Sequence, residues 1–251
     1  MNSTNLRYST LKVVFFLFFW GITPNLYAQT NYKVTYFIAE LKLHGSIDNL
    51  DERGKRFTKQ VIARSKDINY VLIANQNESY FERMDILKKG DDTPLEKIQS
   101  NMAQRFASFN EKTYANHKQD SIIFVRKLVG QDFIIKRDYI NFNWIIKDDT
   151  KKIVGFDAKK AEGKYYNPVT NKELKVEAWF IPSIQLQSGP DIFMGLPGLI
   201  AEINIKGAVI TVKKIEKNEN FEIDKIDDSK AMSQQEYEDL IKDLTKKFIE
   251  E

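Results

Sequence analysis

The chain of 251 residues carries 38 Lys and Arg side chains, 35 Asp and Glu side chains and a formal net charge of +3. The two signs are interspersed, as in residues 213–217, which is typical of a solvated surface. Nucleic-acid binding depends on clustered basic residues that displace counterions, so we expect no nucleic-acid partner. The sequence has no Cys, and His44 and His117 are its two histidines. These counts exclude a disulfide framework and disfavour a zinc site, which needs several Cys or His ligands. We expect no metal and no cofactor.

Residues 1–28 have the pattern of a secretory signal peptide. Arg7 and Lys12 precede an apolar run over residues 13–20, and Ala28 supplies a small residue at the cleavage position. The run is shorter than the roughly 20 apolar residues that a membrane-spanning helix needs. We therefore expect cleavage after Ala28 and a periplasmic mature protein that does not span the membrane. No Cys follows the cleavage position, so a lipid anchor is not expected; the alternative is an uncleaved amphipathic anchor.

Residues 29–251 have the pattern of a single β-rich domain without repeats or low-complexity linkers. Apolar residues recur mostly with the two-residue period of strands, and turn residues separate the runs. The pattern predicts a mainly β (α+β) fold, an antiparallel meander sheet curved toward an open barrel. We expect strands over residues 32–43, 68–74, 79–85, 121–128, 133–138, 143–146, 152–160, 173–180, 199–205 and 209–216. The polar links 75–78, 130–132, 147–150 and 206–208 have the length and composition of hairpin turns.

Three segments have helical patterns. Capping boxes, in which a hydroxyl and a Glu three residues later satisfy each other's amides, begin helices near 93–108 and 233–249. We expect both helices to pack on the sheet. The apolar face of the first is formed by Ile98, Met102 and Phe106, and that of the second by Tyr237, Leu240, Ile241, Leu244 and Phe248. A partner-docking role is the alternative for the second face. Residues 51–66 are a third candidate, which Gly54 weakens.

No recognisable catalytic motif is present in the sequence. It contains no nucleophile elbow, phosphate-binding loop, zinc-protease helix motif or EF-hand loop. The acid pairs at 91–92, 148–149 and 227–228 sit in predicted turns, where acidic residues favour turn geometry and solvation. We expect both histidines to be exposed and assign no catalytic residue. A Ser-His-Asp arrangement assembled from distant segments stays an open alternative.

Residues 188–200 combine turn-forming and bulky apolar residues. A residue before proline is extended, so the pattern predicts a type II turn over residues 196–199 in which glycine takes the positive φ. The preceding glycine would let the chain pass close to another backbone. The apolar side chains favour a turn buried against the sheet, and the alternative is the mouth of a ligand groove. The signature turn consists of Gly195, Leu196, Pro197, Gly198, Leu199 and Ile200.

The run Gly-Leu-Pro-Gly-Leu-Ile resembles the signature of the GLPGLI family of Bacteroidetes envelope proteins. Residues 178–184, which read Ala-Trp-Phe-Ile-Pro-Ser-Ile, match a second block of that family, and Trp144 and residues 152–156 fit its upstream strands. Residues 157–159 lack the Cys that the family usually has there. The resemblance covers residues 144–203. It implies an envelope protein for which the family offers no established activity.

Two functions follow as hypotheses from these patterns. The first is a non-catalytic periplasmic binding, chaperone or accessory module that takes an apolar ligand or an envelope protein on a concave apolar surface. Its partners would be a lipid, a lipidated protein or an outer-membrane transporter. The second is a hydrolase that uses polar side chains only. The candidate ligand-binding residues are Trp144, Trp179, Phe180, Pro182, Phe193 and Leu196.

Overall fold

The computed structural model describes residues 30–43, 46–84, 93–128, 130–167, 172–218 and 220–250. The predicted signal peptide, His44 and the acid pair at 91–92 lie outside the described residues. Among the helices of the described part, none is long and apolar enough to cross a membrane.

One mixed sheet of 12 strands dominates the described chain, which confirms the mainly β fold. The strand order is β12-β6-β5-β4-β3-β2-β1-β11-β10-β9-β8-β7. All neighbours pair antiparallel except β12 and β6, which are parallel. The strands are β1 (Asn31–Leu41), β2 (Asn69–Ala74), β3 (Glu78–Arg83), β4 (Lys112–Asn116), β5 (Ser121–Leu128), β6 (Gln131–Asp138), β7 (Ile145–Ile153), β8 (Phe156–Asn167), β9 (Lys172–Ile181), β10 (Leu199–Asn204), β11 (Ala208–Asn218) and β12 (Met232–Ser233). The helices are η1 (Ile47–Asn49), α1 (Glu52–Ser65), α2 (Pro94–Ala107) and α3 (Gln234–Glu250).

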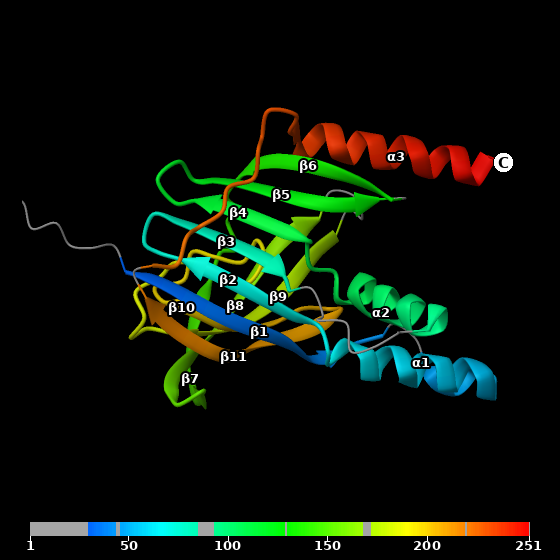
Figure 1. Ribbon diagram of the computed structural model, residues 1–251, viewed down its shortest axis with the longest axis horizontal. Helices are drawn as coiled ribbons and strands as arrows, with labels where there is room; N and C mark the ends of the chain where they lie inside the picture. The colour runs from blue at the N-terminus through cyan, green and yellow to red at the C-terminus, as the bar shows by residue number, and fades with distance from the viewer. Residues whose placement is uncertain are drawn as a thin grey trace, which may run out of the picture.

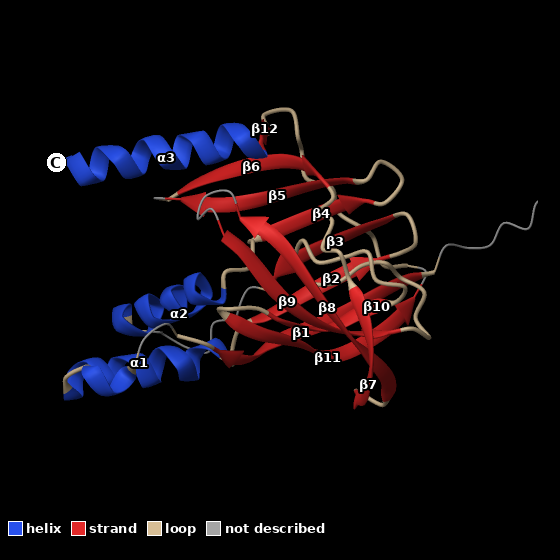
Figure 2. Cartoon of the chain, turned by 180° about the vertical axis from the view of Figure 1, so that it is seen from behind, coloured by secondary structure: helices blue, strands red, loops and turns tan. Residues whose placement is uncertain are grey.

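The sheet curls over on itself without closing, because β12 and β7 remain its two ends among the described strands. Strands β8 and β9 lie behind β2 and β3 in Figure 1 and in front of them in the reverse view of Figure 2. The core fills the space inside the curl and includes fully buried Tyr36, Tyr70 and Phe180. The hydroxyl of Tyr36 on β1 donates to the carbonyl of Ile200 on β10 at 2.7 Å, so this bond reaches across the intervening strand β11. Helices α1, α2 and α3 all project from the same end (Figure 1).

Most predicted strands are present, but one predicted turn is wrong. Residues 147–150 lie inside β7, where the register with β8 shifts and absorbs the polar residues in a bulge. The chain reverses instead at Val154 and Gly155, which both have positive φ, 43° and 88°. Two positive φ values in a two-residue loop match the right-handed twist of the strands they join. Strand β4 was not predicted from its sequence.

The two capping boxes and the third helix are confirmed. Thr93 and Glu96 bond reciprocally at the start of α2, and at α3 the Glu236 amide donates to Ser233 Oγ at 3.2 Å. The Ser233 amide in turn donates to the Glu236 carboxylate at 2.7 Å. Helix α1 begins after Asp51, whose side chain accepts from the amide of Gly54 at 2.7 Å.

The predicted apolar face of α2 is wrong. Ile98 and Phe106 are 52% and 42% exposed. The buried face is formed by Gln99, Gln104 and two alanines instead. The small alanines let α2 approach its neighbours closely, and Gln99 donates to Gln60 of α1 at 2.7 Å. Helix packing therefore buried a stripe of two alanines and two hydrogen-bonded glutamines, and it left the larger apolar side chains of Ile98 and Phe106 exposed.

Helix α3 packs on the sheet through its beginning. Tyr237 is buried, and its ring lies 5.9 Å from the ring of Phe133 on β6. Farther along, Leu240, Ile241 and Leu244 are half-buried. Figure 1 shows the helix running past the end of β6, so only the first part of α3 packs on the sheet. The side chain of Phe248 lies outside the described residues.

Candidate functional site

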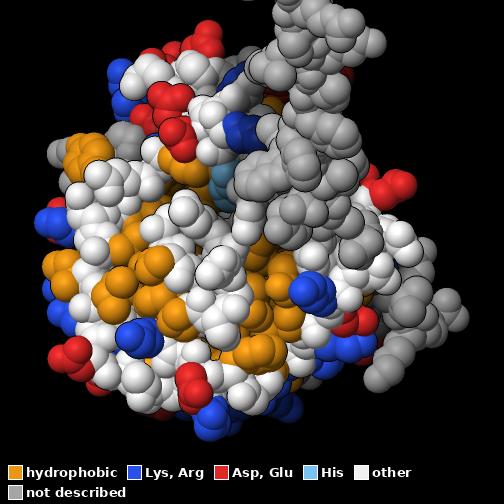
Figure 3. All heavy atoms as spheres, turned by 90° about the vertical axis from the view of Figure 1, so that its left-hand side faces the viewer, with side chains coloured by type: hydrophobic (Ala, Val, Ile, Leu, Met, Phe, Trp, Pro, Cys, Tyr) orange, Lys and Arg blue, Asp and Glu red, His pale blue; other side chains and the backbone are white. Residues whose placement is uncertain are grey.

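The segment between β9 and β10, residues 182–198, folds back on itself inside the curl. The amide of Gly195 donates to the carbonyl of Gln187 at 3.0 Å, and that of Ile200 to the carbonyl of Ser188 at 3.0 Å. Phe193 and Leu196 are 2% and 1% exposed. The apolar side chains of the signature thus belong to the core, as predicted for a turn buried against the sheet. Figure 3 views the end of the molecule opposite the helices, where hydrophobic side chains reach the surface between polar atoms.

The signature does not form the predicted type II turn. The amide of Gly198 bonds the carbonyl of Leu196 at 2.8 Å, a three-residue turn centred on Pro197. Gly195 has a positive φ of 89° and lies beside open space. Gly198 has a φ of 158°, and a Cβ there would lie 2.8 Å from the carbonyl carbon of Ile181. Gly198 thus has the predicted positive φ, although not the value of a type II turn, and it also makes the close approach that was predicted for Gly195.

A carboxylate of the same segment is held inside the core. Asp191 accepts from the side-chain amide of Asn110 at 2.7 Å and from the hydroxyl of Thr113 at 2.8 Å. The backbone amide of Asn110 also donates to it at 3.3 Å. Burial raises the pKa of Asp191, and these three donors together with the charge of Arg126 oppose the rise. Arg126 donates in turn to Asn110 at 2.9 Å, which links the buried carboxylate to the cavity described below.

His117 contacts the signature segment from the turn between β4 and β5. Its Nε2 lies 2.8 Å from Ser188 Oγ, and its Nδ1 lies 2.5 Å from the hydroxyl of Tyr139. Desolvation lowers the pKa of His117, although the charges of Asp120 and Glu78 oppose that shift. The histidine is half-buried rather than exposed as predicted. Ser188 is fully buried, so its hydroxyl does not face a substrate-accessible surface.

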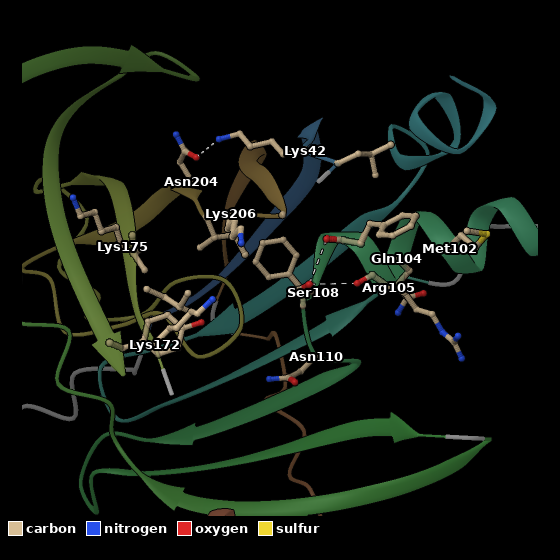
Figure 4. A pocket seen from close by; sticks show the side chains of 18 of the residues that line it. Lys42, Met102, Gln104, Arg105, Ser108, Asn110, Lys172, Lys175, Asn204 and Lys206 are labelled. Carbon is tan, nitrogen blue, oxygen red and sulfur yellow. Dashed lines mark hydrogen bonds between the residues drawn. The ribbon is translucent and has the colours of Figure 1, made fainter. Parts of the chain in front are cut away.

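A cavity of about 2020 Å³ opens at the helix end of the curled sheet. Its wall draws on α1, α2, β5, β8, β9, the β10–β11 turn and Tyr237 of α3. Figure 4 shows side chains from α2 and the residues after it, from β9 and from the β10–β11 turn arranged around the same space. Tyr165 connects it with the signature, because its ring contacts Phe193 at 6.5 Å between centroids. The apolar part of the wall includes Leu43, Phe57, Met102, Phe109, Leu174 and Ile205.

The charged residues at the cavity are predominantly basic. Nine of its described lining residues are Lys or Arg and four are Glu. The acids have basic partners: Glu111 pairs with Arg83 at 3.6 Å and Glu173 with Lys164 at 2.9 Å. Lys160 lies 2.8 Å from Glu177, and its hydrogen bond is the main reason that the pKa of Glu177 is lowered. Glu162 lies 3.1 Å from Lys147.

The six residues proposed from sequence for ligand binding lie elsewhere. Phe180, Phe193 and Leu196 are core residues, whereas Trp144, Trp179 and Pro182 are half-buried. None of the six is among the described residues that line the cavity. Their role in ligand binding stays a prediction.

The two tryptophans have structural partners. Trp144 Nε1 donates to the carbonyl of Met194 at 2.9 Å, and its ring covers Gly163, where a Cβ would lie 2.5 Å from the indole. On the outer face, the Lys151 ammonium sits 4.3 Å from the ring centroid of Trp179. Trp144 therefore joins β8 to the signature segment, and Trp179 joins β9 to β7.

Sequence reasoning missed the cavity because its wall comes from segments between residues 42 and 237. The one local signal is the placement of basic residues at strand ends, such as Lys172 at the start of β9 and Lys206 after β10. No group of three or more metal-ligating side chains is found within the described ranges.

Residues 145–202 match a family model described as a protein of unknown function, Porph_ging. The match coincides with most of the region that resembles the GLPGLI signature, and the two are consistent. A search of curated proteins finds no match. Among solved structures, two crystal forms of PNGF-II are similar, at 16% and 17% sequence identity with TM-scores of 0.47 and 0.48. They cover 84% and 85% of this chain, which spans about a third of theirs (32% and 33%).

Proposed function

We propose that this protein is a non-catalytic binding module that takes a lipid-sized apolar ligand into the cavity at the helix end of its sheet. The observation that carries the proposal is the cavity itself, about 2020 Å³ with apolar side chains contributed by several elements. Pockets for small molecules typically occupy about 300–1,000 Å³, so the space suits a longer ligand. In line with the signal-like residues 1–28, we propose that binding takes place in the periplasm.

The geometry of the signature segment supports the same proposal. Residues 182–198 occupy the interior of the curl, and Phe193 contacts Tyr165 at the cavity wall. This packed segment supports Tyr165 of the cavity wall from behind, and a wall residue held in place in this way reduces the ordering cost of binding. The signature thus acts on binding through the fold rather than by touching the ligand.

Hydrolysis is the second candidate, favoured by the 2.8 Å contact between Ser188 Oγ and His117 Nε2. A nucleophilic serine needs access to substrate and an imidazole oriented as a base. Ser188 has no exposed surface, and the other ring nitrogen of His117 faces the phenol of Tyr139 rather than a carboxylate. This arrangement supports a structural hydrogen-bond chain, so we propose binding rather than hydrolysis.

The test is titration with N-phenyl-1-naphthylamine, a neutral apolar fluorophore, in competition with oleyl alcohol. The wild-type protein should bind the fluorophore at one saturable site from which oleyl alcohol displaces it. The double variant Leu174→Trp/Ile205→Trp fills part of the cavity and should weaken binding by about tenfold or more, since the added rings occupy ligand space.

Thr150→Trp is the matched control, because Thr150 is exposed on the edge strand β7 and lies away from the cavity wall. It should bind like the wild type. Absence of saturable binding by the wild type, or equal loss in the control, would overturn the proposal. Hydrolysis of a p-nitrophenyl ester that Ser188→Ala abolishes would favour the second candidate instead.

A further inference from the structure

We propose that the ligand of this cavity carries an anionic group, and that Lys172, Lys206 and Arg126 bind it. The inference rests on the proposed function, since it names the chemical class of the ligand that the same cavity takes. The ligand would be an acidic amphiphile: an apolar body in the cavity and a carboxylate, phosphate or sulfonate near these three side chains.

The cavity wall carries more basic than acidic side chains. All four of its acids have Lys or Arg partners, as described above. Of the nine bases, Arg83, Lys127 and Lys164 lie within 4.0 Å of a carboxylate. In the described part of the chain, the other six have no carboxylate within that distance. These six are Lys42, Arg105, Arg126, Lys172, Lys175 and Lys206.

The basic side chains that have no carboxylate partner among the described residues lie around one space. In Figure 4 the ammonium groups of Lys172 and Lys206 point into the space that the cavity encloses, although the two residues belong to β9 and to the turn after β10. Lys42 borders the same space, and its ammonium donates to Asn204. The bases thus converge from elements distant in sequence, whereas a solvated surface would spread them.

Arg126 completes the set from the opposite side of the curl. Its Nε donates to Asn110 at 2.9 Å, which fixes the guanidinium at the cavity wall. The nearest buried acid, Asp191, already accepts hydrogen bonds from Asn110 and Thr113. Within the described residues the Nη atoms of Arg126 have no hydrogen-bond partner, so they can donate to a ligand. A guanidinium suits planar, bidentate recognition of carboxylate or phosphate.

The excess of positive charge predicts which class of ligand the cavity prefers. Lys172, Lys206 and Arg126 are exposed to solvent at the cavity, so water and salt reduce the repulsion between their like charges without removing it. An anionic ligand removes the repulsion and gains charge-assisted hydrogen bonds. A neutral ligand of the same shape would leave the repulsion in place. The cavity should therefore discriminate by charge as well as by size.

The experiment compares two probes that share an aromatic body. N-Phenyl-1-naphthylamine is neutral, and 1-anilinonaphthalene-8-sulfonate adds one sulfonate. The full chain without its signal peptide should bind the sulfonate more tightly, and raising the salt concentration should weaken that binding while hardly affecting the neutral probe. The double variant Lys172→Gln/Lys206→Gln should weaken the sulfonate by about tenfold and the neutral probe by less than about twofold.

The matched control is Lys152→Gln/Lys214→Gln, which removes the same net charge from lysines that are 70% and 64% exposed and lie outside the cavity wall. It should bind both probes like the wild type. Arg126→Gln should repeat the selective loss. Oleate should displace the sulfonate better than oleyl alcohol does, which shows that the preference extends to a carboxylate.

Three results decide the matter. Equal affinity of the two probes, or equal losses of both in the double variant, would overturn the anionic ligand but leave an apolar binding site intact. Loss of sulfonate binding in the control would show that net charge alone acts and would also overturn it. If neither probe binds the wild type, the proposed function itself fails.

Discussion

Gly198 passes so close to the strand before the signature that a Cβ would lie 2.8 Å from the carbonyl carbon of Ile181 and 2.9 Å from the Cα of Pro182. Both neighbours are backbone atoms, which cannot swing aside as a side chain can. Gly195, three residues earlier, has the opposite situation: a φ of 89° with open space around it. The two glycines of the signature therefore serve different physical needs, and single substitutions can separate them.

Replacement of Gly198 by Ala should lower the free energy of unfolding by about 3 kcal/mol, because overpacking against backbone is relieved only by moving β9 away from β10. Gly195→Ala should cost about 1 kcal/mol, the strain of a positive φ. Urea denaturation of both variants measures the difference. If Gly195→Ala loses as much unfolding free energy as Gly198→Ala or more, the backbone conformation rather than the close approach is the reason that glycine is needed at these positions.

The buried carboxylate of Asp191 should make stability depend on pH. Because burial raises its pKa in the folded state, the folded protein holds this proton more tightly than the unfolded chain, whose Asp pKa is about 3.9. Its contribution is full below that value and is lost as pH rises through the folded pKa. Asp191→Asn should therefore be most destabilising near pH 4, and the gap to wild type should narrow toward pH 7.

Urea midpoints at several pH values provide the measurement. Asp228→Asn is a suitable comparison, because the hydrogen bond to Lys136 lowers the pKa of Asp228. The pH dependence of its contribution to stability should therefore have the opposite sign to that of Asp191. If the difference in stability between wild type and Asp191→Asn grows as pH rises, the surroundings of Asp191 stabilise the ionised carboxylate, and the prediction is wrong.

His117 should produce the converse dependence. Burial lowers its pKa, so the neutral ring is favoured in the folded state, and its stabilising contribution is present above the unfolded value of about 6.5. That contribution is lost as pH falls through the folded pKa. The wild type should thus lose stability between pH 7 and pH 5, and His117→Gln should lose less over the same interval.

Ser188→Ala is the control, because it removes the hydroxyl that contacts Nε2 at 2.8 Å but keeps the titrating ring. It should cost about 1 kcal/mol at pH 7 and retain the pH dependence. Thermal melting across this range tests both statements. If the melting temperature of His117→Gln depends on pH as that of the wild type does, other groups cause the loss of stability at low pH.

Local sequence determined the elements whose causes lie within a few residues. Strand β5 has the predicted bounds, Ser121–Leu128, because a run of four β-branched and aromatic residues lies near its start and turn residues flank the strand on both sides. The helix starts at Thr93 and Ser233 were predictable because capping joins groups three residues apart. The signature was recognisable as a buried segment, since its apolar side chains need shelter from water.

Tertiary structure decided what depends on partners far away in the chain. Asp191 was invisible as a buried charge, because its donors Asn110 and Thr113 lie 81 and 78 residues away. The apolar face of α2 was predicted wrongly because packing against neighbouring elements, rather than the spacing of apolar residues along the helix, determines which side chains are buried. The cavity likewise exists where separate strand ends meet, so its bases acquire a common function only in the folded chain. Periodicity and capping are local, whereas burial, charge balance and the shape of a cavity arise from long-range packing.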